Sequence, residues 1–160
     1  MSIKYITVED LSNITTYQAG TIQAHVHRAL QKRCDEILAP FGITKMHWMI
    51  IGNVMDAGSK GVRVSDLAEK LGTTISYLTT NVNLLEKTGF LLRTDNKEDS
   101  RSKYIKVMPN QLAKCRKIEK TLREDLRKTI YATIDPDEFR IYMKVMYQLK
   151  SVNKQSATKY

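Results

Sequence analysis

Apolar residues recur every three or four positions along most of this chain, the spacing that one face of an α-helix requires. The first such stretch runs from about Thr7 to Leu38 and ends at the helix-breaking "APFG" of residues 39–42. The next begins after Thr44, a residue suited to cap a helix, and ends at Gly58. Nearly every side chain between them is apolar, so we expect this second helix to be buried on most sides.

Two shorter helices follow, separated by a glycine. The first is predicted within "SDLAEKLG", with Ser65 as its cap and Gly72 as its end. The second is predicted within "TTISYLTTNVNLLEKTG", capped by Thr73 or Thr74 and ended by Gly89. Its core face is expected to hold four apolar residues, namely Ile75, Leu78, Val82 and Leu85.

The rest of the pattern predicts a β-hairpin and two more helices. "VRV" at 62–64 is long enough for only a short piece of strand, whereas "FLLRT" and "YIKV" are two apolar runs with a charged turn between them. A basic helix is expected from Pro109 to about Ile134, and "DPDEF" begins a last helix. The polar tail at 151–160 is expected to be loosely ordered.

The predicted fold class is therefore mainly α with a small β-hairpin wing. The order of helix, glycine turn, helix and hairpin is that of a winged helix-turn-helix. The helices on either side of this unit lie at the N- and C-terminal ends of the chain.

The net charge of the chain indicates what kind of partner it binds. The chain has 26 Lys and Arg against 17 Asp and Glu, a net charge of +9, which favours a polyanionic partner. A basic protein without such a partner is the alternative on charge alone. No stretch reaches the roughly 18 consecutive apolar residues of a membrane span, and the N-terminus lacks a signal-peptide pattern, so we expect a cytoplasmic protein.

Sequence motifs for catalysis, cofactor binding and metal binding are not found. There is no glycine-rich phosphate loop, no HExxH and no nucleophile elbow, so neither an enzyme nor a cofactor is expected. His25 and His27 lie two positions apart and point to different faces of a helix, which is poor spacing for a metal pair. Cys34 and Cys115 are expected to be small, partly buried side chains, with a redox-sensing thiol as the alternative.

The second helix of the pair carries a polar face opposite its core face. This face holds Ser76, Tyr77, Thr80, Asn81 and Leu84, with Lys87 near the end of the helix. Hydroxyl and amide groups can hydrogen-bond base edges in a DNA major groove, and methyl groups can contact thymine. An ordinary solvated helix face is the alternative interpretation.

The segment "DLAEKLGTTISYLTTNVNLLEKTGFLLRTDNKEDSRSK" is similar to the DNA-binding core of the MarR family of bacterial and archaeal transcription regulators. The family pattern is a short helix with a glycine, a capped recognition helix, "LE..G", an arginine in the next strand, and an acidic wing tip with D-x-R. The matching residues here are Leu67, Ala68, Leu71, Gly72, Leu85, Glu86, Gly89, Phe90, Arg93, Asp95, Asp99 and Arg101. The resemblance covers roughly residues 64–103.

The resemblance implies a role for the charged turn "DNKEDSRSK". Arg101 would enter the DNA minor groove, where a narrow groove attracts a guanidinium. Asp99 would hold that guanidinium in position through charge-assisted hydrogen bonds. An acidic turn within a basic chain is thereby explained, although a solvated hairpin tip that prevents edge pairing is the alternative.

The remaining DNA contacts are expected from the recognition helix and the two strands. Base reading is expected from Ser76, Tyr77, Thr80 and Asn81, and phosphate contacts are expected from Thr74, Arg93 and Lys103. Family members often have basic residues where this chain has Thr80 and Leu84. This departure favours either an A/T-leaning operator or an affinity that rests on wing and phosphate contacts.

Two DNA half-sites about one turn apart require a two-fold dimer, so we expect a homodimer on a pseudo-palindromic operator. The expected interface residues are Ile14, Phe139, Tyr142, Val145, Met146 and Leu149, with packing inside one chain as the alternative. We expect a single domain over 1–160. Its parts are a helical dimerisation region at 1–43 and 109–150, a DNA-binding lobe at 44–108 and a tail at 151–160.

The resemblance also implies an effector site where the dimerisation helices meet the DNA-binding lobe. Its expected lining is Tyr17, His25, His47, Trp48 and Ile51, and its expected ligand is a small aromatic or anionic metabolite. Ordinary core packing is the alternative for these side chains. The chain is thus predicted to be a sequence-specific DNA-binding repressor that a ligand can release. The rival prediction is a winged helix that coats DNA without sequence preference or docks other proteins.

Overall fold

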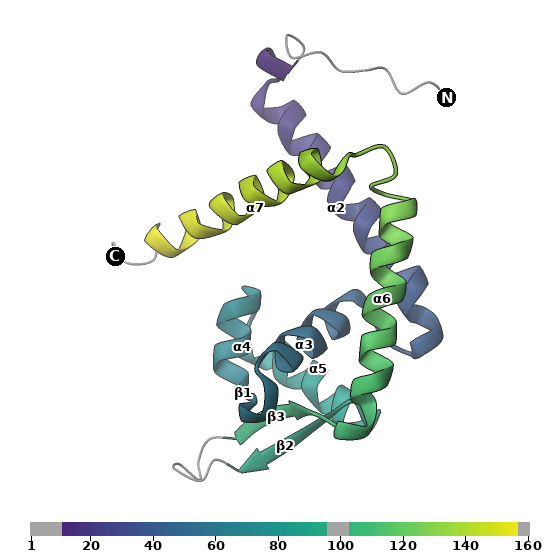
Figure 1. Ribbon diagram of the computed structural model, residues 1–160. Coiled ribbons are helices and arrows are strands. Elements are labelled where there is room, and N and C mark those ends of the chain that lie inside the picture. The colour runs from purple at the N-terminus through teal and green to yellow at the C-terminus, as the bar shows by residue number, and fades with distance from the viewer. Residues whose placement is uncertain (1–10, 96–102, 157–160) are drawn as a thin grey trace. The chain divides into compact units, whose positions relative to one another are not determined.

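The computed structural model describes residues 11–95 and 103–156, which form mainly helices and one small antiparallel sheet (Figure 1). The fold class predicted from the sequence is confirmed. The chain divides into two compact units, Met1–Leu122 and Arg123–Tyr160. No helix in the described part of the chain is long and apolar enough to cross a membrane.

The first unit begins with α2 (Thr16–Leu38), which ends in the 3-10 turn η1 (Ala39–Phe41). Thr15 caps α2: its hydroxyl accepts a hydrogen bond from the Gln18 backbone N–H, and the Gln18 side chain accepts one from the Thr15 N–H at 2.9 Å. This capping box requires extended backbone at Thr15. The expectation of one continuous helix from Thr7 is therefore wrong, because the chain is interrupted at 13–15; residues before 11 lie outside the described part.

The central helix is α3 (Lys45–Asp56), with Ile50, Ile51 and Val54 buried. The predicted cap at Thr44 is confirmed, since its hydroxyl accepts from the His47 N–H at 3.3 Å. The helix is followed by the 3-10 turn η2 (Gly58–Lys60), so the predicted stop near Gly58 is confirmed.

The helix-turn-helix consists of α4 (Val64–Leu71) and α5 (Ile75–Lys87). Gly72 ends α4 in the left-handed region, with φ 64° and ψ 38°, as the sequence predicts. The predicted cap at Ser65 is wrong, because α4 already begins at Val64. Ser65 therefore lies in the first turn, where its hydroxyl donates to the Asp66 carboxylate at 3.2 Å. Thr74 does cap α5, accepting from the Tyr77 N–H at 3.2 Å.

The core face of α5 differs from the prediction at one position. Leu78, Val82 and Leu85 are buried, whereas Ile75 is 57% exposed. Ile75 is the first residue of α5, and helical side chains lean towards the helix N-terminus. Its side chain therefore extends past the end of the helix instead of packing beneath it.

The wing is a three-stranded sheet of β1 (Val62–Arg63), β2 (Leu91–Asp95) and β3 (Lys103–Val107), in the order β1-β3-β2. Ile105 in the middle strand pairs with Val62 on one side and Arg93 on the other, and it is fully buried. Val62 and Arg63 of the short "VRV" segment thus add a further strand, β1, to the predicted hairpin.

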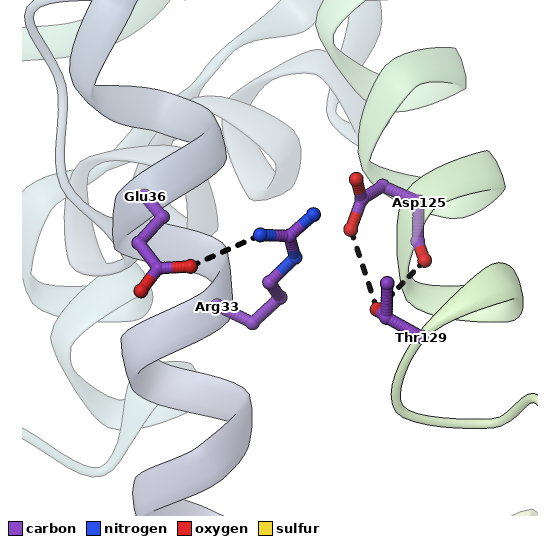
Figure 2. Close-up of polar contacts among 4 residues, drawn as sticks. All are labelled: Arg33, Glu36, Asp125 and Thr129. Atoms are coloured by element: carbon purple, nitrogen blue, oxygen red, sulfur yellow. Dashed lines mark hydrogen bonds and ion pairs between the residues drawn. The ribbon is translucent and has the colours of Figure 1, made fainter.

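The 3-10 turn η3 (Pro109–Gln111) leads into α6 (Leu112–Lys128), whose Cys115, Ile118 and Leu122 are buried. The helix expected from Pro109 to Ile134 is therefore wrong at both ends. The residues after Lys128, "TIYATI", are mostly β-branched or aromatic and have low helix propensity. At this end the Thr129 hydroxyl donates to the Asp125 carbonyl oxygen at 2.8 Å (Figure 2).

Exposed ion pairs contribute little to this fold. On α2, Arg33 Nη1 lies 3.0 Å from a carboxylate oxygen of Glu36, one turn along the helix (Figure 2). Pairs of this kind at a helix surface contribute only about 0.3–0.5 kcal/mol. The stability of the first unit therefore rests on its buried apolar side chains.

The second unit contains α7 (Pro136–Ser156), capped by Asp135. The Asp135 carboxylate accepts from the N–H groups of Asp137 at 2.7 Å and Glu138 at 3.0 Å, and the N–H groups of Glu138 and Asp137 hold the pKa of that carboxyl below its usual value. None of the described side chains of α7 is buried. Helix α7 continues as far as Ser156, beyond the start of the polar tail at residue 151.

Candidate nucleic-acid interface

The face of α5 opposite its core is exposed. Ser76, Thr80 and Leu84 follow one another at intervals of four residues, so they lie in a line along this face. Tyr77 lies beside them, and Tyr77 and Leu84 are 48% and 46% exposed. The structure therefore places three of the four side chains predicted to read bases on this face, and Leu84 lies on it as well.

The fourth, Asn81, is turned towards α3. Its Nδ2 donates to the Tyr77 carbonyl oxygen at 2.8 Å, and its side chain also forms a hydrogen bond with His47. Asn81 is half-buried as a result. The sequence carries no signal of this contact, because His47 and Asn81 lie on separate helices and neither belongs to a recognisable pair.

His47 is a buried link between three helices. Its Nδ1 accepts the Thr44 N–H at 3.2 Å, which completes the capping box of α3, and this requires the ring proton to be on Nε2. In the same turn the Lys45 N–H donates to Asp35 of α2 at 2.7 Å. Burial lowers the pKa of His47, and the hydrogen bond with Asn81 and the charge of Asp35 oppose that shift.

Replacing His47 with glutamine should make the stability of the fold less sensitive to acid. Because burial lowers the pKa of His47 below its ordinary 6.5, the unfolded chain takes up a proton that the folded chain resists. The stabilisation is therefore complete above about pH 6.5 and is lost as the pH falls towards the lowered folded-state pKa. Glutamine keeps a side-chain acceptor for the Thr44 N–H and does not titrate.

Urea unfolding of both proteins at about pH 7.5 and pH 5 measures this effect. The other titrating groups are shared, so the difference between the two proteins isolates His47. An equal loss of stability in both would show that His47 is not the acid-sensitive group.

Arg93 links the wing to α5. Its Nη1 forms an ion pair with the Glu86 carboxylate, and its Nη2 donates to Asn83 Oδ1 at 2.8 Å. The side chains of Arg93 and Glu86 are only 26% and 24% exposed. The arginine expected to contact phosphate is thus held by two residues of α5, and Glu86 and Asn83 are site residues whose role the sequence did not reveal.

The other expected DNA contacts lie at the edges of this face. Thr74 is exposed at the N-terminus of α5, where its hydroxyl is already an acceptor for the Tyr77 N–H. Lys103 is exposed at the first position of β3, paired with Asp95 of β2. Asp99 and Arg101 lie outside the described residues.

The five residues expected to line an effector site are not brought together within one chain. These residues are Tyr17, His25, His47, Trp48 and Ile51. Those on α3 are buried or half-buried, whereas Tyr17 is 73% exposed. Since α2 reaches the start of α3 at Asp35, Tyr17 lies about five helical turns, roughly 27 Å, from that contact. His25 is also exposed, and its Nδ1 lies 3.1 Å from the Thr21 carbonyl oxygen of its own helix.

The residues expected at a dimer interface differ in how exposed they are. Val145, Met146 and Leu149 of α7 are 45%, 46% and 55% exposed. Phe139 and Tyr142 are half-buried, with ring centroids 6.2 Å apart, and Phe139 also meets the edge of Tyr131 at 4.9 Å. In the first unit, Ile14 is 36% exposed just before α2. Both units therefore have apolar side chains that the chain itself does not cover.

Comparison with known proteins connects this geometry to a family. A model of the MarR family matches residues 41–102, the segment from the end of η1 to the residue before β3. Over residues 41–102 this chain is similar to the MarR family. The resemblance found on residues 64–103 of the sequence is thereby confirmed.

A curated relative aligns with about half of this chain. The HTH-type transcriptional regulator PrsX of Escherichia coli is 32% identical over 81 residues, which are 51% of this chain and 49% of PrsX. The chain therefore spans about half the length of that relative. PrsX is named a regulator of transcription.

Three solved structures share the fold over most of the chain. AbsC from Streptomyces coelicolor has a TM-score of 0.73 at 21% identity, covering 89% of this chain and 97% of AbsC. A mutant of MarR from Escherichia coli, complexed with operator DNA, has a TM-score of 0.71 at 22% identity, covering 83% of this chain and 91% of that one. CouR from Rhodococcus jostii RHA1, bound to p-coumaroyl-CoA, has a TM-score of 0.71 at 18% identity, covering 81% of this chain and 89% of CouR.

Proposed function

We propose that this chain is a sequence-specific regulator of transcription that binds double-stranded DNA as a homodimer. The observation that carries this proposal is the exposed face of α5, which lies beside a wing fixed to the same helix through Arg93. The net charge of +9 supports a polyanionic partner. The operator complex of MarR, which has the same fold, supports DNA as that partner.

In this proposal α5 enters the major groove, and the wing follows the neighbouring minor groove. Ser76, Tyr77 and Thr80 face the bases, while Asn81, held by His47 and the backbone, keeps the exposed face of the helix in one arrangement. The wing-tip Arg101 enters the minor groove with Asp99 beside it.

Phosphate contacts hold the protein in register on the duplex. We assign them to Thr74 at the N-terminus of α5, where the helix dipole favours an anion, and to Lys103 at the base of the wing. The proposed mode of control is repression, because a dimer bound over a promoter excludes polymerase without any further contact surface.

The dimer uses the apolar side chains that the chain leaves uncovered. A stripe that includes Val145, Met146 and Leu149 on α7 is available for a second copy, together with the region around Ile14. A two-fold dimer places two α5 helices on half-sites about one DNA turn apart. The operator is therefore expected to be a pseudo-palindrome.

A small aromatic or anionic ligand is the proposed effector. Because Tyr17 and His25 are remote from Trp48 along one chain, a shared site requires residues of α2 from a second copy. CouR binds p-coumaroyl-CoA, an aromatic and anionic thioester, which supports this ligand class within the fold. Saturable quenching of Trp48 fluorescence across a panel of phenolic acids tests the proposal, and no response to any of them would count against it.

The experiment that tests the main proposal is a gel-shift titration with DNA from upstream of the protein's own gene. Scrambled competitor DNA is included, and the titration is repeated at two salt concentrations. Preference for the upstream DNA by about 10³-fold or more establishes sequence-specific binding. Equal competition by scrambled DNA, there and with duplexes selected from a random pool, would instead support a protein that coats DNA without preference.

Two wing substitutions distinguish minor-groove reading from simple charge attraction. Arg101→Ala should weaken operator binding by about 1–3 kcal/mol, because it removes a contact that depends on groove shape. Lys103→Ala should mainly lower the slope of log K against log salt by about one, because it removes a phosphate contact. If both variants bind the operator as the wild type does, the wing does not contact DNA.

A further inference from the structure

The amide and carboxylate side chains of α5 already form hydrogen bonds or an ion pair within the protein. An asparagine reads adenine with both its amide oxygen and its amide nitrogen. Asn81 donates its Nδ2 to the Tyr77 carbonyl and is hydrogen-bonded to His47, and Asn83 uses its Oδ1 to accept from Arg93. Each amide therefore has one of its groups committed to a partner inside the protein, which limits how freely it can turn to present both groups to an adenine.

Few side chains of α5 are of the kinds that read guanine or cytosine. Guanine is most often read by Arg or Lys, and the single basic residue of α5 is Lys87, the last residue of the helix. Cytosine is read by a carboxylate, and the one carboxylate of α5, Glu86, is in the ion pair with Arg93.

Besides the hydroxyl groups of Ser76 and Tyr77, which can donate to or accept from a base edge, the exposed face of α5 carries apolar groups. Leu84 is 46% exposed. Thr80, one turn earlier, donates its hydroxyl hydrogen to the Ser76 carbonyl oxygen at 3.2 Å, which leaves its methyl group and an acceptor oxygen for a partner. Thymine is the base that presents a methyl group in the major groove, and apolar contact is how that group is recognised.

We propose that α5 recognises thymine through its C5-methyl group, with Leu84 and the methyl group of Thr80 as the contacting groups. This inference rests on the proposed function, since it requires α5 to lie in a major groove. It specifies the operator more narrowly than A/T content does: the orientation of each A·T pair matters, because the methyl group belongs to one strand.

The test uses operator duplexes in which single thymines are replaced by deoxyuridine. This replacement removes only the methyl group and leaves the base pair and its O4 acceptor in place. The operator is first selected from randomised duplexes with the wild-type protein, and affinities are then measured by fluorescence anisotropy. Burying one methyl group is worth about 0.8 kcal/mol, so each contacted thymine should show about a fourfold loss of affinity.

Protein variants assign the methyl contact to its residues. Thr80→Ser removes a methyl group and keeps the hydroxyl, and Leu84→Ala shortens an exposed side chain, so neither should unfold the protein. Each should bind the thymine and deoxyuridine duplexes equally at the position that it contacts. Lys87→Ala is the matched control from the same helix: it should weaken binding to both duplexes and leave their ratio unchanged.

The outcomes separate this inference from the proposed function. If the selected operator is still preferred over scrambled DNA but tolerates deoxyuridine at every position, thymine recognition by α5 is wrong and sequence-specific binding stands. If methyl dependence persists in the Thr80→Ser, Leu84→Ala double variant, other residues read the methyl group and the assignment is wrong. If selection yields no preferred sequence, the proposed function itself fails.

Discussion

Replacing Gly61 with alanine should lower the free energy of unfolding by about 3 kcal/mol. Gly61 has φ 75° and ψ −175°, a backbone region that is essentially limited to glycine. An added Cβ would also lie 2.7 Å from the Ile105 carbonyl oxygen and 2.9 Å from Cγ of Lys106. Since Ile105 belongs to the middle strand of the sheet, its backbone cannot move away without disturbing both neighbouring strands.

Gly58→Ala is the matched control. Gly58 also has a positive φ, 60°, but an added Cβ would meet nothing within 4 Å. Its expected loss is about 1–2 kcal/mol, from backbone conformation alone. Urea unfolding followed by circular dichroism measures both variants. Equal losses would mean that the close approach of Gly61 to β3 contributes nothing.

Replacing Arg93 with alanine should lower the free energy of unfolding by about 2 kcal/mol. The change leaves the Glu86 carboxylate, which is 24% exposed, without its ion pair, and it removes the hydrogen bond to Asn83. Arg63→Ala is the control, because Arg63 and Asp66 form a pair that is 51% and 46% exposed and should contribute less than about 1 kcal/mol. A loss of similar size in the two variants would contradict the importance of burial at Arg93.

The same Arg93 variant separates two roles at the DNA. If Arg93 positions the wing, Arg93→Ala should weaken operator binding about tenfold while the slope of log K against log salt stays the same. If Arg93 contacts a phosphate, as the sequence suggested, the slope should fall by about one. Gel-shift titrations at three or more salt concentrations decide between them.

Features set by neighbouring residues were predictable from the sequence. The caps at Thr44 and Thr74 and the glycine end of α4 each depend on a few adjacent side chains. The sequence predicted the Thr44 cap and the glycine end, and it gave Thr74 as one of two candidates for the cap of α5. The predicted cap at Ser65 was wrong because the pattern did not fix the first residue of α4. The residue before it, Val64, also adopts helical backbone. Ile75 was wrongly predicted to be buried, because helical periodicity does not take account of where a helix begins or ends.

The contacts that define the interface were not predictable. The Arg93–Glu86 ion pair depends on how β2 packs against α5, and the His47–Asn81 contact depends on how α3 crosses it. Tertiary packing determines which side chains become partners, and the spacing of apolar residues does not predict that packing. The sequence therefore identified the right helix, and the structure changed which of its side chains are available to DNA.

The exposed apolar stripe of α7 has a consequence for dosage. A helix with no buried side chain among those described gains little from its own chain, so for the proposed dimer its order depends on a second copy. Dissociation follows mass action, and a lone protomer loses the advantage of binding the second half-site intramolecularly. Occupancy of an operator would then rise more steeply than in proportion to the number of chains in the cell, which makes the abundance of the protein a regulatory input.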